Sequence, residues 1–532
     1  MRKLLLALSL FTGIIWLPWL TSCNREPSRA KPTRPDIILI MADDMGFSDL
    51  GCFGGEIHTP NIDNLARNGL SFTQFYNTGR CCPSRASLMT GMYPHTVDMG
   101  WMNSANLGRA GYLGRLSDAA VTLPEALKTG GYRTYMVGKW HLTPTDSIKA
   151  QRGTSWPTDR GFDEFYGTME GAKDYFKPTW LFRNKAPVTV DDPHYFYTDA
   201  ITDTAVAFIG RNPSESPMFL YLAFYAPHFP LHAPDSTVAR YRNSYRSGWK
   251  NIRANRFERQ HQLGLIPVGV RLSDPEADIP GWTDLGMEKR DEMDLRMAIY
   301  AAQVEEMDRG VGKVIAALKA RGRLDNAIIV FLSDNGALAT QPLGRGNREQ
   351  LNASGPYTDY GAAWSHVSNT PYRLYKGFNH EGGIIAPLII QWLKPVAARG
   401  EFCRQPIHIM DLMPTLASLA GVEVPPVRQG LAALKPEGRS FRNLLLDPEM
   451  EMESRPLFWE HEGKRAVRQG GWKLVSPGLK KAWELYSLTD DPTETRDLAS
   501  QNPDRVRELT QLWDTWAREH HVLPLDGQGW DD

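Results

Sequence analysis

Short apolar runs that each end in polar residues recur along the chain and predict the strands of one sheet. They cover residues 37–41, 132–137, 218–225 and 327–332. Their length and their lack of alternation are typical of strands buried on both faces, as in a parallel sheet covered by helices. Helical patterns lie between them, at 60–68, 124–129 and about 291–321. Alternating strands and helices predict an α/β fold.

The residues that follow these runs are rich in groups that bind ions or move protons. They are Asp43 and Asp44 after the first run, Lys139 and His141 after the second, His228 after the third, and Asp334 and Asn335 after the fourth. In open α/β sheets ligands collect outside the carboxyl ends of the strands. We therefore expect a functional site at this edge of the sheet.

Oxygen ligands dominate two of these strand ends. Asp43, Asp44, Asp334 and Asn335 offer only oxygen, which calcium prefers, whereas zinc sites usually recruit His or Cys. The alternative is structural: Asp43 and Asp44 would cap a turn after the first strand, and the Asp334-Asn335-Gly336 sequence would be an ordinary turn.

The pattern changes from about residue 447. Strand-like pieces at 457–462, 465–468, 472–475 and 483–486 are followed by apolar residues at helical spacing over 505–518. These features predict a small antiparallel sheet with one helix. At 532 residues the chain exceeds the size at which a single core usually stops growing. We expect a main domain at 36–446 and a C-terminal α+β subdomain at 447–532.

The first 22 residues have the pattern of a secretory signal peptide, with Arg2 and Lys3 before an apolar stretch. The sequence from Leu20 to Cys23 resembles a bacterial lipobox. That resemblance implies lipidation of Cys23, with residues 23–35 as a flexible tether. We therefore expect an exported bacterial lipoprotein, anchored to a membrane on the periplasmic face or at the cell surface. The alternative is a plain signal peptide or a single membrane anchor.

Charge and cysteine content narrow the function classes further. The formal net charge is -1, so no global field favours nucleic acid, and we expect no nucleic-acid partner. The five cysteines are too few and too scattered for a disulfide scaffold, and they show no paired-cysteine zinc pattern.

Residues 81–91, Cys-Cys-Pro-Ser-Arg-Ala-Ser-Leu-Met-Thr-Gly, form the most specific motif in the chain. The segment resembles the motif of the type I, formylglycine-dependent sulfatases of the alkaline phosphatase superfamily. The resemblance implies that a formylglycine-generating maturation enzyme recognises Cys81, Pro83 and Arg85, and oxidises Cys81 to formylglycine (3-oxoalanine). Cys82 does not fit, because the motif needs one residue between Cys and Pro. The alternative for Cys81 is an ordinary buried thiol.

The resemblance also implies how such a site works. One hydroxyl of the hydrated aldehyde attacks sulfur and displaces the alcohol, and the second drives collapse back to the aldehyde, which expels sulfate. The implied catalytic residues are Cys81, Arg85, Lys139, His141, His228 and Lys376, and the implied ligands of one calcium ion are Asp43, Asp44, Asp334, Asn335 and the modified Cys81. Arg85 and Lys139 would orient the diol and neutralise sulfate oxygens. His141 is expected near the formylglycine, and either His228 or Lys376 would protonate the leaving alcohol.

The resemblance extends from Asp36 to the end of the chain. It implies a large mixed, mostly parallel sheet sandwiched by helices, with a small C-terminal antiparallel sheet and helix. The block at 460–463, Glu-His-Glu-Gly, favours the arylsulfatase branch. We expect a sulfuric ester hydrolase that acts on a sulfated small molecule or glycan, accepting aryl sulfates and exo-acting on carbohydrates. The alternatives are a phosphodiester or phosphonate monoester hydrolase of the same superfamily, and an inactive glycan-binding homologue.

Two further segments are candidates for substrate contacts. Residues 238–259 interleave basic and aromatic side chains, which suits either a cleft for a sulfated sugar or a solvated helix or loop. Residues 341–375, rich in Gly, Asn, Ser, Tyr and Trp, are the stronger candidate, because long loops tend to lie over active sites. His232 and His366 are expected to be structural.

Overall fold

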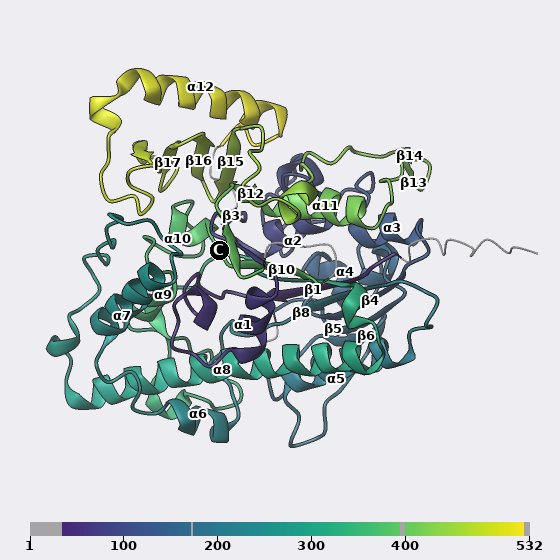
Figure 1. Cartoon of the computed structure of the whole chain (residues 1–532), viewed down its shortest axis with the longest axis horizontal. Coiled ribbons are helices and arrows are strands. Elements are labelled where there is room, and N and C mark those ends of the chain that lie inside the picture. Colours follow the sequence, from purple (N-terminus) through teal and green to yellow (C-terminus); the bar gives the residue numbers. More distant parts are fainter. Residues whose placement is uncertain (1–33, 172–173, 394–398, 526–532) are drawn as a thin grey trace, which may run out of the picture. The chain divides into compact units, whose positions relative to one another are not determined.

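The computed structural model describes residues 34–171, 174–393 and 399–525. Its main feature is a 10-stranded sheet in the order β11-β2-β10-β9-β1-β8-β4-β5-β6-β7 (Figure 1). The five central strands run parallel: β9 (Ala327–Ser333), β1 (Asp36–Ala42), β8 (Met218–Ala223), β4 (Arg133–Gly138) and β5 (Glu164–Thr168). Four of these were predicted as strands from their apolar runs, and the large, mostly parallel sheet is confirmed.

Antiparallel strands make the sheet mixed. They flank the parallel strands as β10 (Leu388–Trp392) beside β9, β2 (Leu70–Phe72) beside β10, β6 (Leu181–Arg183) beside β5, and β7 (Ala186–Pro187) beside β6. The short β11 (Glu401–Cys403) runs parallel to β2 at the edge.

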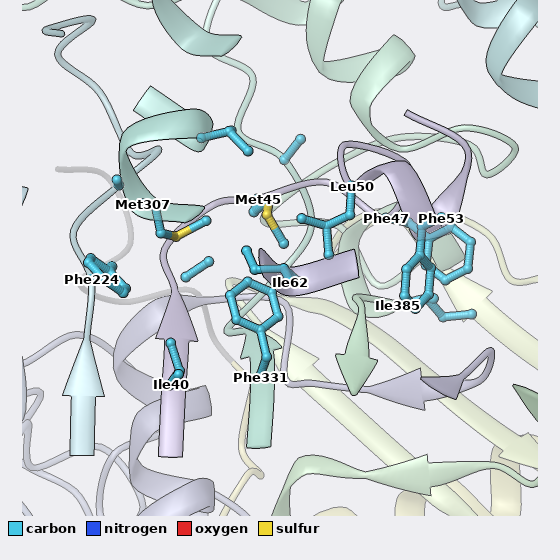
Figure 2. Close-up of a cluster of buried hydrophobic side chains, with 14 of the residues drawn as sticks. Ile40, Met45, Phe47, Leu50, Phe53, Ile62, Phe224, Met307, Phe331 and Ile385 are labelled. Carbon is cyan, nitrogen blue, oxygen red and sulfur yellow. The ribbon is translucent and has the colours of Figure 1, made fainter. Parts of the chain in front are cut away.

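Side chains of β1 alternate between two buried layers, which explains its unbroken apolar sequence. Ile38 and Ile40 face a layer with α1 (Pro60–Arg67), α5 (Tyr197–Arg211) and the long α8 (Met287–Ala320). Figure 2 shows Ile40 and Phe331 in this layer near Ile62 and Met307. Ile37, Leu39 and Met41 face the other layer, with α2 (Cys81–Thr90), α3 (Leu123–Lys128) and α11 (Leu412–Leu419).

Shorter elements complete the main body. They are α4 (Thr145–Lys149), α6 (Asp235–Tyr241), α7 (Trp249–Gln262), α9 (Gly361–Ser368) and α10 (Glu381–Ile384), with the strand pairs β3 (Phe75–Tyr76) and β12 (Ile407–His408), and β13 (Val427–Arg428) and β14 (Leu431–Ala432).

A separate antiparallel sheet follows near the C-terminus, as predicted. Its order is β15 (Leu457–His461), β16 (Lys464–Gln469), β17 (Trp472–Ser476) and β18 (Glu484–Ser487), and α12 (Pro503–Glu519) packs against β16 and β17 (Figure 1). Buried polar contacts join this sheet to the main body: the Trp459 indole donates to the carbonyl of Asn77 at 2.7 Å, and the Lys473 ammonium lies 2.6 Å from Glu381. The boundary between residues 446 and 447 stays a prediction.

The predicted signal peptide at 1–22, Cys23 and residues 24–33 of the tether lie outside the described residues. Within the described part of the chain, no helix is both long and apolar enough to span a bilayer.

Candidate active site

The carboxyl ends of the four predicted strands meet at one buried site. The backbone N–H of Asp44 donates to Asp334 at 3.2 Å, and the Asn335 amide donates to Asp44 at 2.7 Å, which joins the ends of β1 and β9. The Lys139 ammonium, after β4, lies 2.5 Å from the Asp43 carboxylate. His228, after β8, lies with its Nε2 3.4 Å from Asp44 Oδ2.

Cys81 enters this site as the first residue of α2. The helix tolerates Pro83 in its first turn, where a missing N–H breaks no helical hydrogen bond, and it ends at Gly91 in the left-handed conformation. Cys81 is 3% exposed, and ligand atoms of Cys81, Cys82 and His141 all lie within 4.8 Å of one another. The helix N-terminus adds a favourable potential for negative charge at this position.

The surroundings of Cys81 favour its anionic form. A hydrogen bond with the Cys82 thiol lowers the pKa of Cys81 well below its usual value, and the charges of Lys139 and Lys376 lower it further against the effect of burial. His141, whose backbone φ is +61, lies beside it, and burial lowers the pKa of this imidazole. A positive φ is uncommon for residues other than glycine, and it persists where the surrounding structure enforces it.

Arg85 ties α2 to three strand ends. Its guanidinium is fully buried, donates to the Lys139 carbonyl at 2.8 Å and to Asp334 at 3.0 Å, and lies 3.6 Å from Asp43. Burial alone would raise the pKa of Asp43, but the neighbouring charges of Lys139, His228 and Arg85 hold it below its usual range.

Lys376 and His228 both contact Asp44, and they differ in protonation. Lys376 forms an ion pair with Asp44. Burial by itself lowers the pKa of Lys376, yet Asp44 and Cys81 raise it above its usual value, so the ammonium stays charged. Burial lowers the pKa of His228 to about 4, and its Nδ1 lies 2.7 Å from the carbonyl of Phe229.

Three buried oxygens of the predicted metal ligands lack hydrogen-bond partners among the described residues: Asp43 Oδ1, Asp44 Oδ2 and Asn335 Oδ1. Buried oxygens without partners are rare and call for an explanation such as a bound ion. Burial and the Asp43 charge also raise the pKa of Asp334 well above its usual value, as expected where carboxylates crowd together. This oxygen set fits a hard cation such as calcium.

The two segments expected to contact substrate differ in outcome. Residues 238–259 lie largely in α6 and α7, which fits the helical part of the alternative. Arg253 and Arg256 are not solvated, because both are buried against protein partners. Residues 341–375 are not one loop, because they contain α9. Their Tyr357 is 41% exposed, and its ring centre lies 5.8 Å from that of Phe229, beside His228. Contact with substrate stays a prediction.

His232 and His366 are both buried; the ring contact of His232 fits a structural role, and the structural role of His366 stays a prediction. Nε2 of His232 lies 2.7 Å from the carbonyl of Ala353, and His366 lies inside α9, where its own carbonyl accepts from Arg253.

Comparison with known proteins identifies the family. A family model described as Sulfatase matches residues 35–422. The chain belongs to the sulfatase family. It is similar to an uncharacterized sulfatase of Schizosaccharomyces pombe, with 33% identity over 93% of this chain and 95% of the relative. It is also similar to an arylsulfatase of Klebsiella aerogenes, with 32% identity over 74% of this chain and 88% of the relative.

A solved structure shares the fold. Ps i-CgsB in complex with k-i-k-neocarrahexaose superposes with a TM-score of 0.65 and 26% identity, covering 94% of this chain and 100% of the other. This protein is therefore a sulfatase enzyme, with the mixed sheet and the C-terminal antiparallel sheet that its sequence predicted.

Some residues near the sulfatase site were not predicted from the sequence. The Lys139 ammonium lies 5.4 Å from the centre of the Tyr225 ring, on the segment after β8. Arg80 and Glu462 form an ion pair at 3.8 Å. Arg80 immediately precedes the Cys81 motif, and Glu462 belongs to the 460–463 block, which favours the arylsulfatase branch.

Proposed function

We propose that this sulfatase hydrolyses sulfate esters at Cys81 in its formylglycine form, with one calcium ion held by Asp43, Asp44, Asp334 and Asn335. The observation that carries the proposal is the convergence of these oxygens on Cys81, Arg85, Lys139 and Lys376 at one strand edge. The hydrated aldehyde supplies a nucleophilic hydroxyl and a second hydroxyl that allows sulfate to leave. The calcium ion supplies positive charge toward a sulfate oxygen.

Cations of the chain bind and orient the sulfate group. Lys139 and Lys376 both act electrostatically on Cys81, and the buried Arg85 holds the Lys139 backbone in place through its carbonyl. Fixed charges in a site that excludes water stabilise the charge that develops on sulfate oxygens, and they need no reorganisation during the reaction. Buried ion pairs to Asp43 and Asp44 hold both lysines.

The leaving alcohol needs a proton at the oxygen that bridges it to sulfur. Lys376 and His228 both contact Asp44 and border the site. Lys376 keeps its proton, whereas His228, whose pKa is lowered to about 4, holds a proton on Nε2 only at acidic pH. The hydrogen bond of His228 Nδ1 with the carbonyl of Phe229 fixes the ring and directs Nε2 toward the site. His141 lies on the Cys81 side of the site, where it orients the hydrated aldehyde.

Sulfated carbohydrates are the proposed natural substrates, cleaved in an exo mode, with aryl sulfates also accepted. Support comes from the arylsulfatase relative and from the carbohydrate bound to the neighbour Ps i-CgsB. The lipobox-like sequence before Cys23 supports an exported lipoprotein on the periplasmic face or the cell surface, which meets such glycans outside the cytoplasm. Maturation requires a formylglycine-generating enzyme in the same host.

The test measures sulfate release by protein matured in its own host, from 4-nitrophenyl sulfate and from a panel of sulfated mono- and oligosaccharides. Matched phosphate mono- and diesters are tested separately as alternative substrates, and their turnover is compared with that of the sulfate esters. Faster turnover of the sulfate esters is expected. Preference for the phosphorus esters would instead support the phosphodiester or phosphonate hydrolase alternative, and release of sulfate from none of the sugars would contradict the carbohydrate assignment.

A further inference from the structure

The turn between β15 and β16 holds a strained acidic residue. Two residues, Glu462 and Gly463, connect the strands, with φ of +54 and +74. Two-residue turns with positive φ at both positions favour Asn-Gly or Asp-Gly, because few other side chains adopt this conformation easily. Glu462 therefore occupies its position against local preference. Such strain persists where the surroundings enforce it, and it concentrates at functional sites.

Buried groups hold this turn in place. The Glu460 carboxylate accepts from the backbone N–H of Gly463 at 2.9 Å and from the Tyr112 hydroxyl at 2.6 Å. The ring of His461 stacks on Trp101, with ring centres 5.1 Å apart. The turn is thus preorganised by residues of the main body, which is what a binding site requires of its supporting contacts.

Glu462 lies at the edge of the active site and faces two cations. Its carboxylate lies 3.8 Å from Arg80 Nη2 and 3.6 Å from His461 Nε2, and it accepts from Lys464 at 2.9 Å. Arg80 directly precedes Cys81 in the chain, and its charge acts on Lys376. The side chains of Arg80 and Glu462 are 29% and 24% exposed, so both are accessible to a ligand beside the nucleophile.

The spacing between Arg80 and Glu462 suits a bridging hydroxyl. A separation of 3.8 Å is too long for a direct hydrogen bond. A hydroxyl both donates and accepts, so it can donate to the carboxylate and accept from the guanidinium.

We infer that Arg80 and Glu462 form a subsite that binds hydroxyl groups of the sugar ring carrying the sulfate ester. The inference rests on the proposed function and specifies its substrate class. A ring without hydroxyl groups, such as that of 4-nitrophenyl sulfate, leaves the subsite unused. The pair therefore selects carbohydrate sulfates over aryl sulfates.

The test compares kcat/KM for the best monosaccharide sulfate with kcat/KM for 4-nitrophenyl sulfate. Glu462→Asn places the preferred residue in the turn and removes the carboxylate, so the fold is retained or stabilised. We expect the ratio of sugar to aryl kcat/KM to fall at least about tenfold, mainly through a higher KM for the sugar, because a polar group of the site loses its partner. Arg80→Lys, which keeps the charge but loses the planar guanidinium that faces Glu462, should lower the ratio in the same direction.

The matched control is Glu453→Gln, an 88% exposed acid paired with Arg439 at 3.3 Å in a different part of the surface; it should leave the ratio unchanged. An unchanged ratio in Glu462→Asn and Arg80→Lys, with sugar and aryl sulfates both cleaved, overturns the subsite and leaves the proposed function standing. Cleavage of aryl sulfate alone by the unaltered enzyme also overturns the subsite. Cleavage of neither substrate by protein carrying the aldehyde refutes the proposed function itself.

Discussion

Removal of calcium should lower the thermal stability of the matured enzyme by several degrees. Three buried oxygens, on Asp43, Asp44 and Asn335, have no hydrogen-bond partner among the described residues. A buried polar atom without a partner costs about 1–3 kcal/mol. Leaving all three oxygens without the cation should therefore lower the free energy of unfolding by roughly 3–9 kcal/mol. For a chain of 532 residues, an unfolding entropy of about 2.1 cal/mol/K per residue converts this to roughly 3–8 °C in Tm.

The assay is differential scanning calorimetry of the enzyme with excess chelator and after calcium is restored. Asp43→Asn, which removes one ligand charge, should reduce the calcium-dependent shift. Asp308→Asn is the matched control, because this buried carboxylate accepts hydrogen bonds from Asn61 and Ile62 and lies outside the strand-end cluster; its shift should match that of the unaltered enzyme. Equal Tm values with chelator and with calcium would refute the assignment of these oxygens to a cation.

Three other predictions concern catalysis, packing and pH. Lys139→Ala should lower kcat for sulfate release by about 100-fold or more, since one fixed charge on the sulfate is lost. The control is Lys185→Ala, which replaces a surface lysine paired with Asp159 and should not change kcat in the same assay. Gly138→Ala should destabilise the fold by about 1–3 kcal/mol in urea unfolding, because a Cβ there would lie 1.8 Å from the Ala223 carbonyl oxygen. Gly210→Ala should not destabilise it, because the space around Gly210 is open. Equal losses of unfolding free energy in the two variants would contradict the packing argument. Burial and a nearby arginine lower the pKa of His408 to about 3, so between that pH and about 6.5 the unfolded chain binds a proton that the folded chain excludes. The free energy of unfolding should therefore fall as the pH drops below about 6.5, by about 2 kcal/mol at pH 5. His408→Asn should flatten this dependence in urea titrations at about pH 6.5 and pH 5, and an unchanged slope would contradict the assignment.

Much of the fold could be predicted from the sequence because strands buried on both faces leave continuous apolar runs. Strands β1, β8 and β9 are apolar at nearly every position, so their runs stood out. Strand β5 was missed, because its Tyr, Gly and Thr interrupt any apolar run. This strand pairs on one side with a short antiparallel neighbour. The missed β10 is apolar, but nothing local shows that it inserts antiparallel beside β9.

The site residues also divide into those that the sequence could place and those that it could not. Residues that directly follow buried strands, such as Asp43 and Lys139, could be placed together because the carboxyl ends of parallel strands share one edge. The pairing of Arg80 with Glu462 could not, because it joins a helix N-terminus to a hairpin turn distant in the chain. Its one local signal was a Glu-Gly turn where Asn-Gly or Asp-Gly is expected.

The central claim is that Cys81 acts as formylglycine. The most direct measurement is the mass of the tryptic peptide 81–85 from protein made in its own host, taken across preparations together with their rates of sulfate release. We predict the mass of an aldehyde in place of the Cys81 thiol, with sulfatase activity proportional to the aldehyde fraction. Full activity in protein whose Cys81 is an unmodified thiol would contradict the account.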